Sequence, residues 1–322
     1  MGNAAAVPPM TATPTRNAGA LARRAGRVAG LLLGLAFALS SWAKAVDPRG
    51  FAEEIVRQGL LPDALAHPAA LAVIVLEAAL AAALILGLRQ RPVLGVATAL
   101  MAFFLGLAAW QLAFPPEDAA SCGCFGNVVP QSPVQHVITN AVLFALALAS
   151  WLGRGPVARA RLRGMLAAAV ALAALVFALA APHLPIDGWP GVTLLREGVP
   201  LDALPIADAV PEAFEGTWLV LLIDRADEAT RAAVPVINER LALVPGETGV
   251  VALAEENPEL EGEFLWTAGP AFPVHSVPWS MIKPLYRSLP RAFVVRDGRV
   301  VRVWNGLPDG DELAALAEGR IP

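Results

Sequence analysis

The stretch AALAVIVLEAALAAALILGL, residues 69–88, decides the fold of this chain. It carries one charged residue, Glu77, and as a helix rising about 1.5 Å per residue it is long enough to cross about 30 Å of hydrocarbon. A bilayer offers no partner to unpaired backbone groups, so a helix is the expected conformation. The pattern predicts a bundle of about five transmembrane helices, because similar apolar stretches occupy 26–46, 92–114, 134–152 and 164–182.

The composition is that of a membrane protein. Of the 322 residues, 56% are hydrophobic and 16% charged, and the mean hydropathy is +0.57, so the apolar surface exceeds what one soluble core of this size needs. The lipid bilayer is therefore an expected partner. The formal net charge is −4 and the basic residues form no broad patch, which argues against nucleic acid binding. Two cysteines cannot make a disulfide framework.

Arginines gather in alternate connections between the apolar stretches. They precede the first stretch and separate the second from the third and the fourth from the fifth, whereas 115–133 contains no Lys or Arg. The positive-inside rule then predicts a multi-pass protein of a bacterial inner membrane, with a cytoplasmic N-terminus and a periplasmic C-terminal region. An alternative remains: Ala43-Lys44-Ala45 is similar to a signal-peptide cleavage site, and cleavage would leave four helices on unchanged sides.

Three regions are expected along the chain. Residues 1–24 have the composition of a disordered cytoplasmic tail, 25–184 form the transmembrane domain, and 190–322 form a soluble domain of ordinary size. The soluble part has the order of an α/β domain. Its predicted elements are a strand at 217–223, a helix at 226–243, a strand at 249–253, a hairpin of 292–296 and 299–304 around Asp297-Gly298, and a helix at 309–318.

The only cysteines, Cys122 and Cys124, are separated by Gly123 in the loop between the third and fourth apolar stretches. A disulfide between thiols one residue apart departs from preferred geometry, which makes it easier to reduce. A labile bond on the oxidising side of a membrane suits exchange with the thiols of another protein. Three alternatives stay open: a permanent bridge that shapes the loop, a chance pair of interfacial cysteines, or a pair bound to a soft metal. No metal site is expected, because the four histidines are not clustered.

Glu77 lies about 12 Å below the periplasmic end of its helix at 1.5 Å per residue. A carboxyl group at that depth is costly, so it must be protonated, paired or turned toward a polar cavity. Lys44, near the same end of the first helix, is the nearest basic residue in depth. One possible role of this pair is to handle protons or to form a polar site for a quinone, and Gln111, His136 and Asn140 would then complete the pocket. The other is to lock two helices together.

Several of these segments together resemble the MauE branch of the DoxX-like membrane proteins. They are KAVDPRGF at 44–51, GLLP at 59–62, Leu76-Glu77, and CGCFG at 122–126. The resemblance covers roughly 26–152 and implies a compact helical bundle tied to periplasmic disulfide chemistry. The MauE branch is linked to methylamine utilisation. The resemblance therefore also implies a role in maturation of the disulfide-rich small subunit of methylamine dehydrogenase. It assigns redox work to Cys122 and Cys124 and the family's polar pair to Lys44 and Glu77.

The soluble domain resembles thioredoxin-like domains of the TlpA type. The strand 217–223, the helix sequence RAAVP at 231–235 and Leu289-Pro290 ahead of the final hairpin fall where that fold has its first central strand, active-site helix and cis-proline. The Cys-x-x-Cys positions instead read Asp227-Glu-Ala-Thr230. This domain is therefore expected to be a degenerate thioredoxin that docks a partner.

The resulting expectation is a membrane thiol-disulfide oxidoreductase acting on a periplasmic protein that carries thiols or disulfides. Its electrons would pass to a membrane acceptor such as a quinone, although no sequence motif marks a quinone site. The alternative is a non-enzymatic assembly or scaffold subunit whose outer domain binds a partner and whose cysteines only staple a loop.

Overall fold

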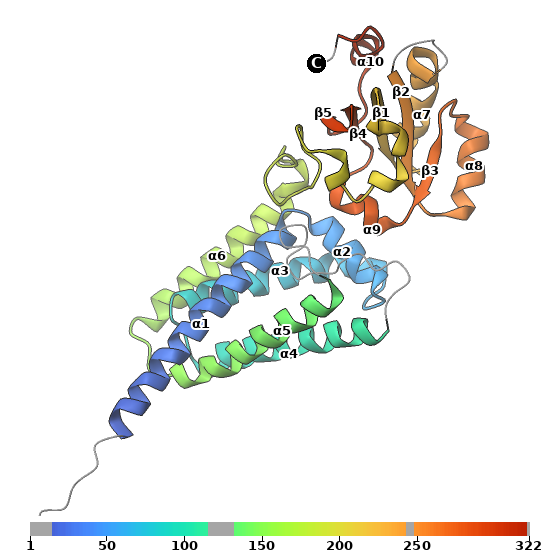
Figure 1. The fold of residues 1–322 in the computed structure, drawn as a ribbon. Helices are drawn as coiled ribbons and strands as arrows, with labels where there is room; N and C mark the ends of the chain where they lie inside the picture. Colours follow the sequence, from blue (N-terminus) through green and yellow to red (C-terminus); the bar gives the residue numbers. More distant parts are fainter. Residues whose placement is uncertain (1–14, 115–131, 243–247, 321–322) are drawn as a thin grey trace, which may run out of the picture.

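The computed structural model describes residues 15–114, 132–242 and 248–320. It comprises a helical bundle with an α/β domain at one end (Figure 1). Five helices are long and apolar enough to cross a membrane, as expected, so this is a multi-pass membrane protein. These helices are α1 (Thr15–Ala45), α3 (Asp63–Ile85), α4 (Arg91–Ala113), α5 (Pro133–Ser150) and α6 (Ala160–Ala180).

The first helix starts earlier than the sequence suggested. The predicted disordered tail extended to residue 24, but α1 begins at Thr15. Residues 15–24 read TRNAGALARR, in which Ala, Leu and Arg are strong helix formers and no proline interrupts the pattern. Helix propensity therefore extends α1 beyond its apolar stretch.

Helix α1 is central to the bundle. It packs against α3 and α5, while α3 also packs against α6 and α4 against α5. Large side chains such as Leu33, Phe37 and Leu84 are fully buried where these helices meet. Elsewhere the helices expose large apolar side chains such as Phe103 and Leu172, as lipid-facing helices do.

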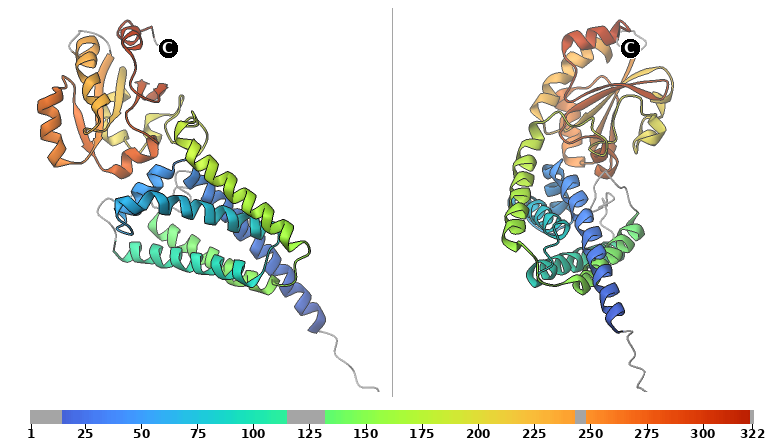
Figure 2. Two further views of the ribbon diagram at one scale, coloured as in Figure 1. Left: turned by 180° about the vertical axis from the view of Figure 1, so that it is seen from behind. Right: turned by 90° about the vertical axis from the view of Figure 1, so that its left-hand side faces the viewer.

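A short helix, α2 (Pro48–Arg57), joins α1 to α3 and was not predicted. Asp47 caps it by accepting a hydrogen bond from the Gly50 N–H at 2.9 Å, and Pro48 occupies its first turn. It buries Ala52 and Ile55 and lies at the end of the bundle beside the α/β domain (Figure 2). We call this the domain-facing end; the opposite end, at Arg27, Arg89 and Arg163, is the arginine-rich end.

The α/β domain has a five-stranded mixed sheet in the order β3-β2-β1-β4-β5. Strands β1 (Thr217–Ile223), β2 (Thr248–Glu255) and β3 (Val274–Val277) are parallel, whereas β4 (Arg291–Arg296) runs antiparallel to β1, and β5 (Arg299–Trp304) antiparallel to β4. One apolar cluster includes Val220 and Phe293, and a second includes Leu219 and Val294. Because neighbouring strand residues point to opposite faces, the clusters cover the two faces of the sheet.

This arrangement confirms the α/β order expected from the sequence. Helix α7 (Glu228–Ile237) follows β1, the Leu289–Pro290 peptide bond is cis directly before β4, and Asp297 and Gly298 form the hairpin turn with positive φ. The predicted helix 226–243 is shorter, because five π-helical residues, 238–242, follow α7. Three further helices complete the domain: α8 (Pro258–Ala268), α9 (Trp279–Ile282) and α10 (Gly310–Ala317).

Candidate functional site

Lys44 and Glu77 meet inside the bundle, as the sequence predicted. The Lys44 Nζ lies 2.9 Å from both carboxylate oxygens of Glu77, and Glu77 is completely buried. The two residues come from α1 and α3, which pack side by side. Burying charges carries a desolvation penalty even when they are paired, so this ion pair contributes little net stability to the membrane bundle.

The ion pair is held by neighbours that the sequence did not single out. Lys44 also donates a hydrogen bond to Ser40, one turn earlier in α1. Its ammonium group lies 5.3 Å from the ring centre of Phe51 and 5.5 Å from that of Phe104, close enough for cation–π attraction. Ser40 was detectable in principle, because serine four residues before a buried lysine lies on the same helix face.

Of the three polar residues expected around the pair, two lie on α5. Asn140 is buried, lines a cavity together with Ser40 and Phe104, and donates a hydrogen bond to the His136 backbone oxygen at 2.9 Å. Gln111, on α4, has a buried Nε2 without a hydrogen-bond partner in the described part of the chain. Phe104 of α4 and Asn140 of α5 thus bring both helices to the region of the ion pair.

Cys122 and Cys124 lie outside the described residues. Their place in the chain is nevertheless informative, because residues 114–132 connect the end of α4 to the start of α5. Those helix ends lie at the domain-facing end of the bundle (Figure 1). Phe104 of α4 and Asn140 of α5 link the same two helices to the ion-pair region.

Among the described residues, the space next to the ion pair is too small for a quinone. The cavity next to it has a volume of about 10 Å³, enough for at most one water molecule. A larger cavity of about 300 Å³ lies between α1, α3 and α6, but its lining of Ala, Val, Ser41, Trp42 and Phe177 contains no titratable group. A role for quinone stays a prediction.

The α/β domain is attached to the bundle by Arg287, which the sequence gave no reason to select. Its guanidinium group donates to both carboxylate oxygens of Asp187, at 3.0 and 3.1 Å. It also donates to the backbone oxygens of Val46, Ala181 and Leu184, at 2.8–2.9 Å. One side chain thus joins the end of α1, the end of α6 and the linker between the domains.

Further ion pairs connect the domain to α2 and its N-cap, Asp47, and one of them joins Lys283 Nζ to Glu53 Oε2 at 3.5 Å. Lys283 Nζ lies 3.1 Å from Asp47 Oδ2, and Arg57 Nη2 lies 2.7 Å from Glu255 Oε1. The Arg57 guanidinium also covers the ring of Trp279, 4.5 Å from its centre. These contacts fix α2 against the α/β domain.

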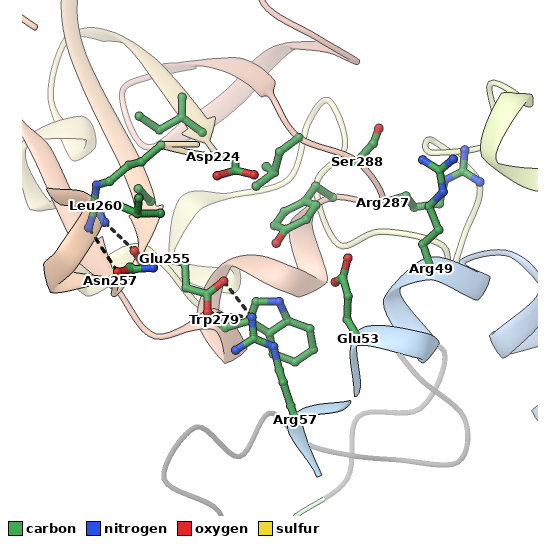
Figure 3. Close-up of a pocket in the computed structure, with 15 residues that line it drawn as sticks. Arg49, Glu53, Arg57, Asp224, Glu255, Asn257, Leu260, Trp279, Arg287 and Ser288 are labelled. Carbon is green, nitrogen blue, oxygen red and sulfur yellow. Dashed lines mark hydrogen bonds and ion pairs between the residues drawn. The ribbon is translucent and has the colours of Figure 1, made fainter. Parts of the chain in front are cut away.

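A pocket of about 570 Å³ lies between α2 and the carboxyl ends of β1 and β2 (Figure 3). Helix α2 supplies Arg49, Glu53 and Arg57 to it. The facing residues include Asp224 and Glu255 at the strand ends, and the segment Tyr286–Leu289 before the cis-proline. The carboxyl ends of parallel strands are a usual place for ligands in open α/β sheets.

Tyr286 shows how enclosed this pocket is. The residue is 7% exposed, and burial raises the pKa of its phenol above its usual value of about 10, with the nearby carboxylates of Glu53 and Glu255 adding to the rise. The hydroxyl therefore stays protonated at any physiological pH.

Asp227 and Thr230, which replace the expected cysteines, have a structural role. The Asp227 carboxylate accepts hydrogen bonds from the Thr230 N–H at 2.8 Å and from its hydroxyl at 3.1 Å. The two residues thereby cap α7. Neither residue carries a thiol.

Fold and site define a class: a multi-pass membrane protein with a buried Lys–Glu pair in its bundle and an α/β domain clamped to one end. Residues 22–153, less than half of the chain, match the family model described as Methylamine utilisation protein MauE. The membrane bundle is thus similar to that family over α1 to α5, which agrees with the resemblance seen in the sequence.

The α/β domain gives a weaker likeness. A solution structure named as a candidate protein disulfide isomerase from Bacteroides thetaiotaomicron matches with a TM-score of 0.29 and 15% identity. That match covers 34% of this chain and 74% of the other. No curated protein sequence matches the chain.

Proposed function

We propose that this protein handles disulfides of a periplasmic partner protein through Cys122 and Cys124. The observation that supports the proposal most is the buried Lys44–Glu77 pair, because Lys44 contacts Phe104 of α4, one of the two helices that the cysteine-bearing connection joins. An ionic group at membrane depth is by default a sign of function. The similarity of residues 22–153 to the MauE model adds methylamine utilisation as the process in which to seek the partner.

The proposed reaction is thiol-disulfide exchange. A thiolate of the partner attacks one sulfur of the Cys122–Cys124 disulfide and forms a mixed disulfide, and the other cysteine leaves as a thiolate. A second partner thiolate then attacks the mixed disulfide and releases Cys122 and Cys124 in the reduced state. Two electrons and two protons pass from the partner to the cysteine pair, so one exchange needs no outside oxidant.

Lys44 and Glu77 are proposed to keep the domain-facing end of the bundle polar and rigid during this exchange. The pair joins α1 to α3, and Lys44 also contacts Phe104 of α4. The pair places an ionic group inside a low-dielectric bundle, where electrostatic effects reach further than in water. In the Glu77→Gln variant, which keeps both cysteines, the rate of thiol-disulfide exchange with the partner is expected to change.

The test is a redox titration of the intact protein in glutathione buffers, followed by alkylation of free thiols. A pair that serves exchange should have a potential above about −300 mV, whereas structural disulfides are generally lower. The Cys122→Ser/Cys124→Ser variant should lose exchange with a reduced dithiol peptide. The matched control is Ser121→Ala in the same connection, which should keep it.

A non-enzymatic scaffold is the second candidate, and the clamp of the α/β domain favours it. A domain without cysteines, held by Arg287 to three segments of the chain, suits a fixed docking platform. Full partner maturation by the double-serine variant, together with a potential below about −300 mV, would exclude the exchange reaction in favour of the scaffold.

A further inference from the structure

The arginine-rich end of the bundle contains guanidinium groups that converge on one place. Arg89, in the connection between α3 and α4, donates a hydrogen bond from Nη2 to the Arg27 backbone oxygen at 3.1 Å. A Cβ atom added to Gly87 would lie 3.2 Å from Arg89 Nη1 and 3.3 Å from Arg163 Nη1. The two guanidinium groups therefore face the same small space beside Gly87, with α1 next to them.

No carboxylate in this part of the sequence compensates these charges. The first acidic residue of the chain is Asp47, and neither 86–92 nor 150–163 contains Asp or Glu. Burial, followed by the like charges of Arg27 and Arg163, lowers the pKa of Arg89 from its ordinary value. Arg89 Nε is also buried without a hydrogen-bond partner among the described residues. The arrangement has donors and positive charge in excess.

Two helix N-termini increase that excess. Helix α4 begins at Arg91 and α6 at Ala160, and neither N-cap residue, Gln90 or Arg159, makes a side-chain capping hydrogen bond. The first turn of a helix carries free N–H groups and the positive end of the helix dipole. Arg163 follows within the first turn of α6, where a positive charge is unfavourable unless an anion is present.

Apolar surface adjoins the charges. Leu162, Met165 and Leu166, around Arg163 on α6, are all exposed large hydrophobic residues. A ligand that fits both features has an anionic head and apolar tails. Arginine forks bind phosphate oxygens in pairs, and basic pockets between transmembrane helices on the cytoplasmic side are known places for acidic lipid head groups.

We propose that Arg89 and Arg163, with Arg27 beside them, bind the phosphate of an anionic phospholipid from the leaflet at the arginine-rich end. The acyl chains lie along the exposed apolar face of α6. The lipid supplies the negative charge that the protein lacks there.

The test uses the full-length protein in a neutral detergent. Phosphatidylglycerol, phosphatidylcholine with the same acyl chains, and inorganic phosphate are added separately. Retained lipid is measured by native mass spectrometry and stabilisation by the thermal midpoint. Phosphatidylglycerol should remain bound and raise the midpoint, and the other two should not.

Substitutions test whether Arg89 and Arg163 bind the phosphatidylglycerol. Arg163→Gln and Arg89→Gln should each weaken apparent phosphatidylglycerol affinity by about tenfold, the size of one lost charge-assisted contact. Arg163 is the safer variant, because its side chain makes no hydrogen bond in the described part of the chain, and circular dichroism verifies folding. Arg24→Gln is the matched control, since it removes the same charge outside the cluster and should change affinity by less than about twofold.

Three results would overturn the proposal. Equal losses in Arg163→Gln and Arg24→Gln would mean that the arginines act only as a topology signal. Equal stabilisation by phosphatidylcholine would remove the need for a negative head group. The same midpoint shift with inorganic phosphate would assign the site to a soluble anion and exclude the lipid.

Discussion

The two ends of the bundle treat charge in opposite ways. At the domain-facing end, cations are matched by carboxylates: Lys44 by Glu77, Lys283 by Asp47, Arg287 by Asp187 and Arg57 by Glu255. At the arginine-rich end, Arg27, Arg89 and Arg163 come together with no acid in the surrounding sequence. The positive charges at one end are therefore neutralised by carboxylates of the protein itself, whereas those at the other end require an anion from outside the chain.

Breaking the most buried pair should have the largest effect on stability. Lys44→Met leaves the fully buried Glu77 without its partner and should cost about 3–5 kcal/mol of unfolding free energy. The measurement is the denaturant or thermal midpoint of the purified protein in detergent. The double variant Lys44→Met/Glu77→Leu should recover most of the loss, because it leaves no uncompensated charge. A double variant as unstable as the single one would show that the pair itself is essential to the fold.

The next largest effect should come from Arg287→Gln, which removes the clamp between the domains. Loss of a hydrogen-bonded, partly buried charge should cost about 2–5 kcal/mol of docking free energy. Limited proteolysis of the linker near Asp187 should become faster, with the membrane bundle intact. Arg302→Gln, on the exposed side of β5, is the control and should leave the cleavage rate unchanged. Unchanged cleavage in Arg287→Gln would mean that the α2 ion pairs hold the domain alone.

Tyr286 reports on the same interface through pH. It is the only tyrosine in the chain, so phenolate absorbance isolates its titration. Its pKa is raised in the folded protein, so the unfolded chain loses this proton first, and the stabilising contribution declines as pH rises above about 10. Native protein should titrate later than denatured protein. In Arg287→Gln the two curves should move together; curves that stay apart would show that the pocket survives undocking.

The smallest effect is expected at the arginine-rich end. In lipid-free detergent, Arg163→Gln removes one of several like charges and should change the unfolding free energy by less than about 0.5 kcal/mol, or raise it. The measurement is the same denaturant midpoint as for Lys44→Met. A loss comparable to that of Lys44→Met would mean that Arg163 has an internal partner, and the contrast between the ends would disappear.

Long patterns in the sequence predicted most of the architecture. Five apolar stretches became the spanning helices, and Asp297-Gly298 marked the hairpin, because burial and turn geometry are local requirements. Helices α2, α8 and α9 and strand β3 were missed, since elements of four to eleven residues are too short for a clear period. The Asp47-Pro48 cap was the available signal for α2.

The site was only partly predictable, for a physical reason. Lys44 and Glu77 stood out because a charge at membrane depth needs a partner, and few partners exist there. Arg287 looked like any surface arginine, because its acceptors are backbone oxygens and an acid 100 or more residues away in sequence. Its role depends on how the linker folds, which no local pattern records. The roles of Cys122 and Cys124 stay predictions.

The position of Arg287 also matters for anyone who divides the chain. A soluble fragment starting near Ile186 would keep Asp187 but leave behind Val46, Ala181 and Asp47, the bundle-side partners of Arg287 and Lys283. Such a fragment would present Trp279 without Arg57 over its ring. Ligands or antibodies selected against it would therefore recognise a face that the whole protein keeps covered.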